Sequence, residues 1–178
     1  DIYIGGRISN VSGIGAADGA AYFDGANWNA IGSGFNNTIN ALAVDGTDIL
    51  IGGNPYSKAS DSSENLIRWD GANISQVGEQ GVNDMVHAVV AYGTDLYVGG
   101  EFRNPGFGDF EYIAKYDGTT WSALGTGFGN GVNTIVRDLK VIGDDLYVAG
   151  KFDNAGGNGN ADEIARWDLT DETWNAMG

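Results

Sequence analysis

Three polar residues that recur at one position of a repeated sequence are the first candidates for chemistry: Asn40, His87 and Arg137. Their amide, imidazole and guanidinium groups can hold a ligand by hydrogen bonds, and an imidazole can also transfer protons. His87 is the only histidine, and nothing in the sequence places a serine and an aspartate beside it, so a Ser-His-Asp triad is not indicated. One histidine and no cysteine also argue against a transition-metal centre built on several such ligands. We expect simple solvation of the three side chains here, with a ligand-binding position as the alternative.

Carboxylates are the next candidates, because the chain contains 24 aspartates and glutamates. Two of them could hydrolyse a glycosidic bond, but chance pairs are expected at this density, so a glycoside hydrolase or lyase ranks third among the hypotheses. The segment "DNAGGNGNADE" (153–163) is rich in the oxygen ligands that calcium prefers. Its candidate ligands are Asp153, Asn158, Asn160 and Asp162. Because the EF-hand spacing is absent, we expect an acidic loop and no cofactor, with calcium as the alternative.

Aromatic side chains could stack on sugar rings if they stood in exposed, variable loops. Four residues meet this description by their sequence position: Tyr56, Phe107, Phe110 and Tyr112. A carbohydrate-binding protein with a glycan partner is therefore the leading alternative function. The tryptophans occupy fixed positions of the repeat, which predicts that they pack between repeats instead.

The elements that must position these residues belong to an internal repeat. Its most regular marker is a strand-like phrase that opens at Asp1, Asp48, Asp95 and Asp145, at spacings of 47, 47 and 50 residues. A full unit has four short segments rich in aliphatic and aromatic residues, as in "INALAV" (39–44), "DILIGG" (48–53), "LIRWDG" (66–71) and "ISQVG" (74–78). The Asp-Gly connectors between them are typical of tight hairpins.

Four strands in a unit of about 47 residues predict an all-β chain, a β-propeller built from about four four-stranded antiparallel blades. We expect a single repeat domain over residues 1–178, with units at about 1–47, 48–94, 95–144 and 145–178. The first unit lacks its inner strand, which would leave an open sheet edge. We therefore expect a part of a larger propeller, or an oligomeric one formed by ring completion or strand exchange between chains.

The two ends of such a blade differ in their connections. Short turns join the first strand to the second and the third to the fourth, whereas the long connections lie at the opposite end. The longest segments there are roughly 7–19, 54–65, 101–111 and 151–163. Variable loops on a rigid scaffold commonly carry binding sites, so we expect binding at the long-loop end. The aspartates that recur at the short turns are expected to cap those turns rather than to catalyse.

The composition argues against two classes of binding partner. A formal net charge of −15 argues against nucleic acid and against anionic lipid, because both are bound through lysine and arginine. No run of 18 apolar residues is present, so we expect no membrane insertion. The 30 glycines suit a chain of many tight turns.

One family resemblance rests on three phrases of the third unit: "LYVGGEF" (96–102), "IAKYDG" (113–118) and "WSALG" (121–125). Their order and spacing resemble the kelch-like β-propeller repeats of secreted bacterial proteins, and the resemblance extends over the whole chain. The second unit departs from it, because Ile74 stands where tryptophan is expected and Asn54-Pro55 replaces a charged residue and phenylalanine. The resemblance implies a propeller in an extracellular or cell-surface protein.

These observations together predict a non-enzymatic structural or recognition scaffold. Its partner would be another protein or a further copy of the chain, through protein interaction, adhesion or assembly. A fold of this kind hosts many activities, so the fold alone does not identify the ligand.

Overall fold

The computed structural model of the chain describes residues 1–15, 17–32, 35, 38–54, 65–79, 81–103, 111–125 and 131–177. Fifteen β-strands in four antiparallel sheets and one short 3-10 turn, η1 (Val11–Gly13), make up the regular structure of these residues. None of the helical structure described is long or apolar enough to cross a membrane.

Each sheet is a meander whose strands pair in chain order, and we refer to the sheets as blades 1 to 4. Blade 1 contains β1 (Ile2–Gly5), β2 (Ala20–Phe23) and β3 (Trp28–Ala30). Blade 2 contains β4 (Ile39–Asp45), β5 (Asp48–Gly53), β6 (Leu66–Trp69) and β7 (Ile74–Gln76). Blade 3 contains β8 (Val86–Tyr92), β9 (Asp95–Arg103), β10 (Glu111–Tyr116) and β11 (Trp121–Ser122). Blade 4 contains β12 (Val136–Ile142), β13 (Asp145–Gly150), β14 (Ile164–Asp168) and β15 (Thr173–Ala176).

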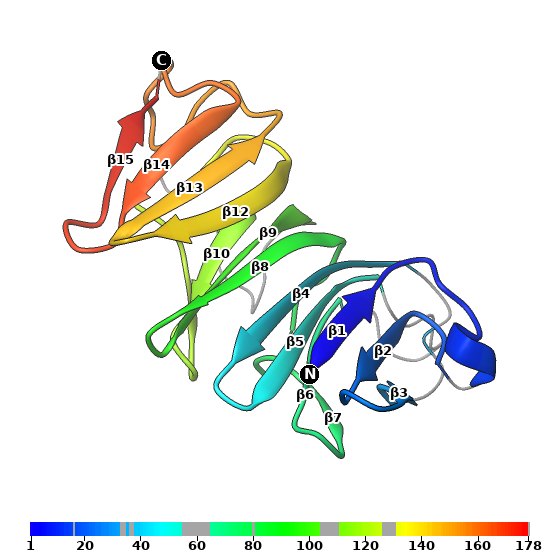
Figure 1. Cartoon of the computed structure of the whole chain (residues 1–178). Coiled ribbons are helices and arrows are strands. Elements are labelled where there is room, and N and C mark those ends of the chain that lie inside the picture. The colour runs from blue at the N-terminus through cyan, green and yellow to red at the C-terminus, as the bar shows by residue number, and fades with distance from the viewer. Residues whose placement is uncertain are drawn as a thin grey trace.

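The expected all-β fold of four successive antiparallel blades is confirmed. Blade 1 has three strands among the described residues and the others have four, as the repeat predicts. The blades follow one another from blade 1, near the N-terminus, to blade 4, at the C-terminus, and these two blades lie at opposite ends of the molecule (Figure 1). The inner strands β4, β8 and β12 lie side by side, and each of them contacts the preceding blade: β4 contacts β1, β8 contacts β4, and β12 contacts β8.

The short turns are of two kinds. Between β4 and β5 the pair Asp45–Asp48 closes a two-residue loop in which Gly46 has a φ of +62°, as expected for a primed hairpin turn. The Asp-Gly turn between the third and fourth strands is longer than the two-residue loop between β4 and β5. In blade 1 it spans residues 24–27, because the carboxylate of Asp24 accepts hydrogen bonds from the backbone N–H groups of Ala26 and Asn27.

The hydrophobic core consists of three clusters, one at each seam between successive blades. The first glycine of the repeated phrase allows each seam to close. A Cβ added at Gly5 would lie 2.7 Å from Ile39, and one at Gly52 would lie 2.6 Å from Val86, in both cases on the inner strand of the next blade. A side chain at these positions would therefore push the neighbouring blade away.

Candidate functional site

Asn40, His87 and Arg137 come together at the long-loop end of the inner strands. Each lies at a shift in register between its inner strand and the second strand of the same blade, with Asn40 between Ile39 and Ala41 as the first example. Such a β-bulge inserts one extra residue and re-aims its side chain. The same irregularity in three successive blades therefore directs three different polar side chains to one place.

A fourth residue, Glu101 of β9, joins them, and we call the group of Asn40, His87, Glu101 and Arg137 the axial cluster. His87 Nε2 lies 2.8 Å from Glu101 Oε1. Arg137 Nη1 lies 3.4 Å from the same oxygen. Asn40 Nδ2 donates to the backbone oxygen of Val86 at 3.2 Å and lies 3.5 Å from His87 Nδ1.

The proton on the imidazole of His87 can be assigned from these contacts. His87 Nε2 lies 2.8 Å from both Glu101 Oε1 and Arg137 Nη1, but a single ring nitrogen cannot donate to one and accept from the other. A proton on Nε2 satisfies the carboxylate and leaves Nδ1 to accept from Asn40, so we assign this tautomer. Arg137 then bonds to Glu101 instead of to the ring.

Electrostatics within the axial cluster favour the ionised carboxylate. The hydrogen bond from His87 holds the pKa of Glu101 below its ordinary value, while partial burial acts in the opposite direction. The positive charges of Arg137 and Lys151 add to the lowering. Glu101 is therefore a fixed negative charge that orients one imidazole and one guanidinium at physiological pH.

The axial cluster offers donors to solvent. The side chain of His87 is 11% exposed, whereas those of Glu101 and Arg137 are 36% and 43% exposed. A guanidinium has five N–H donors and can bind a carboxylate through two of them at once. The geometry thus suits the binding of an anionic or polar group more than proton transfer.

Sequence reasoning identified three members of the axial cluster and missed Glu101. The missed signal is the register of the sheet. Glu101 directly follows the Gly-Gly of the repeated phrase, and that pair lies opposite the bulge residue of the inner strand, where Val86 pairs with Gly100 and Ala88 with Gly99. A charged residue in this position is therefore held beside the bulge.

The aromatic residues proposed for sugar stacking receive no support as a group. Tyr56, Phe107 and Phe110 lie outside the described residues. Tyr112 was expected in a variable loop, but it lies in β10 and is only 8% exposed. Strand β10 begins earlier than the sequence indicated, and the Tyr112 hydroxyl accepts a hydrogen bond from Arg103 Nη2 at 2.8 Å. Its ring is packed into the seam beside blade 4 and does not offer the exposed face that sugar stacking requires.

The residues proposed for calcium form a hydrogen-bonded loop. Asp153 accepts a hydrogen bond from the side-chain amide of Asn133. Asn158 Oδ1 accepts from the backbone N–H of Asn160 at 3.0 Å, which fixes a local turn. Asp162 is exposed. Among the described residues no three acidic, histidine or cysteine side chains gather closely enough to hold a metal ion.

Most other charged residues at recurring positions stabilise the blades themselves. Arg68 lies 2.7 Å from Asp45 and 3.0 Å from Asp48, within blade 2. Lys115 and Arg166 occupy the same position in blades 3 and 4, and each pairs with the aspartate that opens the second strand of its blade, at 3.1 Å. These cations therefore pair with acids on the same strand face of their own blade.

Comparison with known proteins gives no matching family model and no similar curated protein. The function must therefore be argued from the residues and their geometry.

Proposed function

We propose that this chain is a non-enzymatic recognition scaffold of the extracellular or cell-surface kind, which binds an acidic segment of a protein partner at the axial cluster. The observation that carries the proposal is the convergence of three bulge residues from successive blades. Bulges at equivalent positions direct three different side chains the same way. Together these side chains form one surface with residues from three blades.

The chemistry of the axial cluster supports an anionic ligand. Arg137 uses part of its guanidinium on Glu101 and leaves the rest accessible, because its side chain is 43% exposed. Lys151 follows β13 and adds a second positive charge near Glu101. On a chain with a net charge of −15, such a site gives specificity by geometry and not by general attraction.

A titration with a short glutamate-rich peptide, followed by NMR of the arginine side chains, tests this proposal. We expect the Arg137 Nε resonance to shift on addition of the peptide. Arg137→Gln should weaken binding by roughly tenfold or more, because a charge-assisted pair is lost. Lys140→Gln removes the same charge from the same strand and serves as the matched control.

Two outcomes would contradict the proposal. The first is the absence of any shift at Arg137 up to millimolar peptide. The second is an equal loss of affinity in both variants, which would show that only net charge matters. Neutral oligosaccharides in a parallel titration test the carbohydrate hypothesis, and binding of these alone would replace the acidic segment as the ligand.

A further inference from the structure

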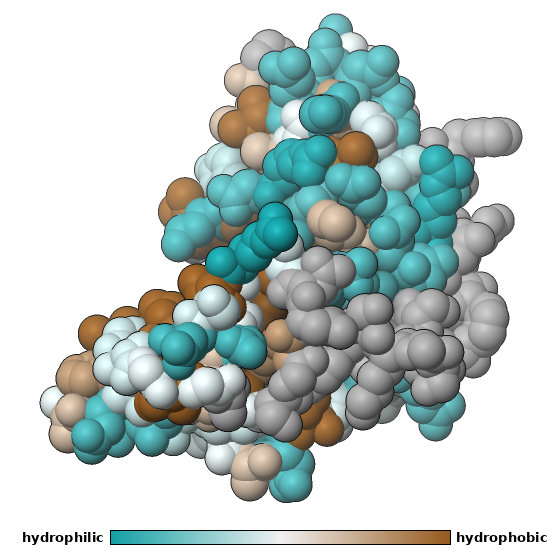
Figure 2. Space-filling view, turned by 90° about the vertical axis from the view of Figure 1, so that its right-hand side faces the viewer, coloured by the Kyte–Doolittle hydropathy of each residue, from teal (hydrophilic) through white to brown (hydrophobic). Residues whose placement is uncertain are grey.

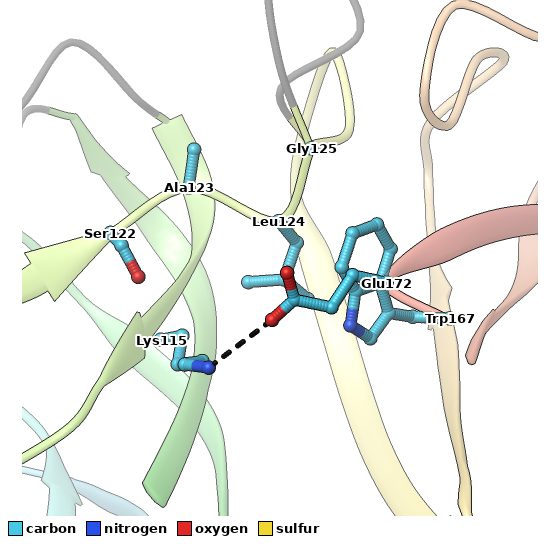
Figure 3. A pocket seen from close by; sticks show the side chains of 7 residues that line it. All are labelled: Lys115, Ser122, Ala123, Leu124, Gly125, Trp167 and Glu172. Carbon is cyan, nitrogen blue, oxygen red and sulfur yellow. Dashed lines mark hydrogen bonds and ion pairs between the residues drawn. The ribbon is translucent and has the colours of Figure 1, made fainter. Parts of the chain in front are cut away.

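A hollow in the seam between blades 3 and 4 differs from the surrounding surface by its shape and its lining. On the face of the molecule shown in Figure 2, apolar residues reach the surface among polar ones, so their exposure alone does not mark a ligand site. The hollow has a volume of about 260 Å³, and residues of both blades line it (Figure 3). We call it the seam hollow. Small-ligand sites combine such a concave shape with a few convergent polar groups.

The seam hollow corresponds to the place of an aromatic ring in another seam. Between blades 1 and 2, the ring of Tyr22 packs against that of Trp69, with centroids 5.3 Å apart. Lys115 and Trp167 hold the same two repeat positions in blades 3 and 4, and both line the seam hollow. The thin chain of a lysine thus replaces a ring beside the tryptophan. This seam therefore has room for a ring that a ligand can supply.

A second replacement also widens the seam hollow. Ala123 is part of its lining, whereas Gln76 holds the same repeat position in blade 2. The methyl group of an alanine fills much less space than the side chain of a glutamine. The two replacements together account for a hollow at this seam.

The ammonium group of Lys115 is less fully paired within its blade than its equivalent in blade 2. Arg68, that equivalent, pairs with two aspartates of its own blade. In blade 3, Tyr92 stands at the position of the first of these aspartates, and Lys115 pairs with Asp95 at 3.1 Å. Lys115 Nζ also reaches across the seam hollow to Glu172 Oε1 of blade 4, at 3.5 Å (Figure 3).

A longer turn places Glu172 beside the seam hollow. Six residues separate the paired Trp167 and Trp174, whereas four separate the corresponding pair in each of the other blades. Glu172 ends this turn with a φ of +51°, a conformation that is uncommon for residues other than glycine. Its side chain is 66% exposed, and an ion pair so open to solvent contributes little. A ligand can therefore replace this contact at small cost.

The polar groups of the seam hollow include both donors and acceptors. The ammonium of Lys115 donates, the carboxylate of Glu172 accepts, and the hydroxyl of Ser122 can do both. Trp167 is 4% exposed, and its indole N–H makes no hydrogen bond with the described residues. With Asp95 included, two carboxylates stand against one ammonium, so an anionic ligand is disfavoured. A neutral ring with hydroxyl groups, which donate and accept, matches this lining.

We propose that the seam hollow binds one neutral sugar ring, either a free monosaccharide or the end of a glycan. The ring takes the place beside Trp167 that Tyr22 takes beside Trp69. Its hydroxyl groups bond to Lys115, Ser122 and Glu172 in place of the long ion pair. This site lies at the short-turn end of the blades, and it does not depend on the acidic segment proposed for the axial cluster.

NMR of the tryptophan indole N–H groups during titration with glucose, galactose and mannose tests the proposal. We expect the Trp167 Nε1 resonance to shift, with a dissociation constant of about a millimolar or weaker, because a ligand of this size gains little per atom. The methyl glycosides of the same sugars separate the two sources of the ring. Binding of the methyl glycosides indicates the end of a glycan, and binding of the free sugars alone indicates a monosaccharide.

Two variants locate the binding. Ala123→Gln fills the seam hollow with the residue that blade 2 has at this position, so it should abolish the shift at Trp167 in a folded protein. Ala176→Gln is the matched control, because it makes the same change at the same repeat position of blade 4, which does not line the seam hollow. Glu172→Gln keeps the size of an exposed side chain and removes its charge, so it should weaken binding by roughly fivefold.

Three outcomes would overturn the proposal. The first is an unchanged Trp167 resonance with every neutral sugar far above millimolar concentration. The second is equal binding by Ala123→Gln and Ala176→Gln. The third is tighter binding of glucuronate than of glucose, which would make the ligand an anion. Arg137→Gln should leave the affinity for sugar unchanged, so this proposal and that for the axial cluster can fail separately.

Discussion

The two ends of the blades use the repeat in opposite ways. At the short-turn end, the same residue does the same work in every blade: Asp24, Asp70, Asp117 and Asp168 each accept two backbone N–H groups of the following turn. At the axial end, the equivalent bulge positions hold asparagine, histidine and arginine. The backbone irregularity is repeated there, but the side chain is not. The recurring side chains at the turns thus serve the fold. The differing side chains on a repeated backbone are positions where the residue can vary with the ligand.

The largest effect should follow from a side chain added at the axial end. Gly100 is the second glycine of the repeated phrase, and a Cβ there would overlap the backbone oxygen of Met85 at the start of the inner strand. Because backbone atoms cannot move aside as a side chain can, Gly100→Ala should reduce the free energy of unfolding by about 1–3 kcal/mol or more. Urea denaturation followed by circular dichroism measures the loss.

Gly159→Ala is the control for this substitution. A Cβ at Gly159 would meet nothing within 4 Å, so we expect a change within about 0.5 kcal/mol. If Gly100→Ala were as stable as the control, the close approach between the second glycine and the inner strand would not be what fixes the axial end.

At the short-turn end, replacing a glycine should reduce the free energy of unfolding by a smaller amount and for a different reason. Gly118 has a φ of +94°, and a Cβ there would meet nothing within 4 Å. Gly118→Ala should therefore cost only the strain of this backbone conformation, about 1–2 kcal/mol, again measured by urea denaturation. A loss larger than that of Gly100→Ala would contradict the view that packing is tighter at the axial end.

The repeat is enough to predict the strands and the structural residues from the sequence alone. Periodic markers gave the fifteen strands, and the recurrence of Asp117 and its equivalents correctly indicated turn capping. Both follow from local rules, because a strand needs only suitable residues and an Asx turn needs only its own neighbours. The close proximity of Asn40, His87 and Arg137 was also expected in part, since they share one repeat position.

The rest of the axial cluster depends on contacts between strands that no local pattern encodes. Glu101 joins His87 because of the bulge in β8, and a bulge changes the register without a distinctive residue of its own. The sequence predicts Tyr112 in a loop because the end of a long connection carries no sharp sequence signal, yet β10 already begins at Glu111. Tyr112 is buried because it packs in a seam with residues of blade 4, which are distant from it in the sequence.

The turn aspartates should make stability dependent on pH at the acidic side. Hydrogen bonds from Thr119 and Thr120 lower the pKa of Asp117 well below its ordinary value. A carboxyl group with a lowered pKa in the folded state stabilises the fold above its unfolded pKa, about 3.9, and loses this contribution as the pH falls through its folded pKa. The difference in stability between the protein and Asp117→Asn should therefore be full at pH 6 and shrink as the pH approaches 2.

Chemical denaturation at a series of pH values between 6 and 2 measures this dependence. Asp171→Asn removes the same charge from an exposed turn, so it separates the effect of net charge from that of the turn bonds. A stability difference for Asp117→Asn that stayed constant from pH 6 to pH 2 would mean that its carboxylate contributes nothing as an anion.

The smallest effect on stability should come from the axial cluster itself. Glu101→Gln removes an ion pair between side chains that are 36% and 43% exposed, and such pairs contribute less than about 1 kcal/mol. The amide still accepts from His87, so the ring keeps its place while Arg137 loses its anchor. We expect little change in urea denaturation and a larger change in the mobility of the Arg137 side chain, measured by NMR relaxation. A destabilisation equal to that of Gly118→Ala would instead show that the axial cluster serves the fold. The divergence of its residues would then reflect three separate packing solutions. A binding surface, by contrast, can be altered without loss of stability in the scaffold that presents it.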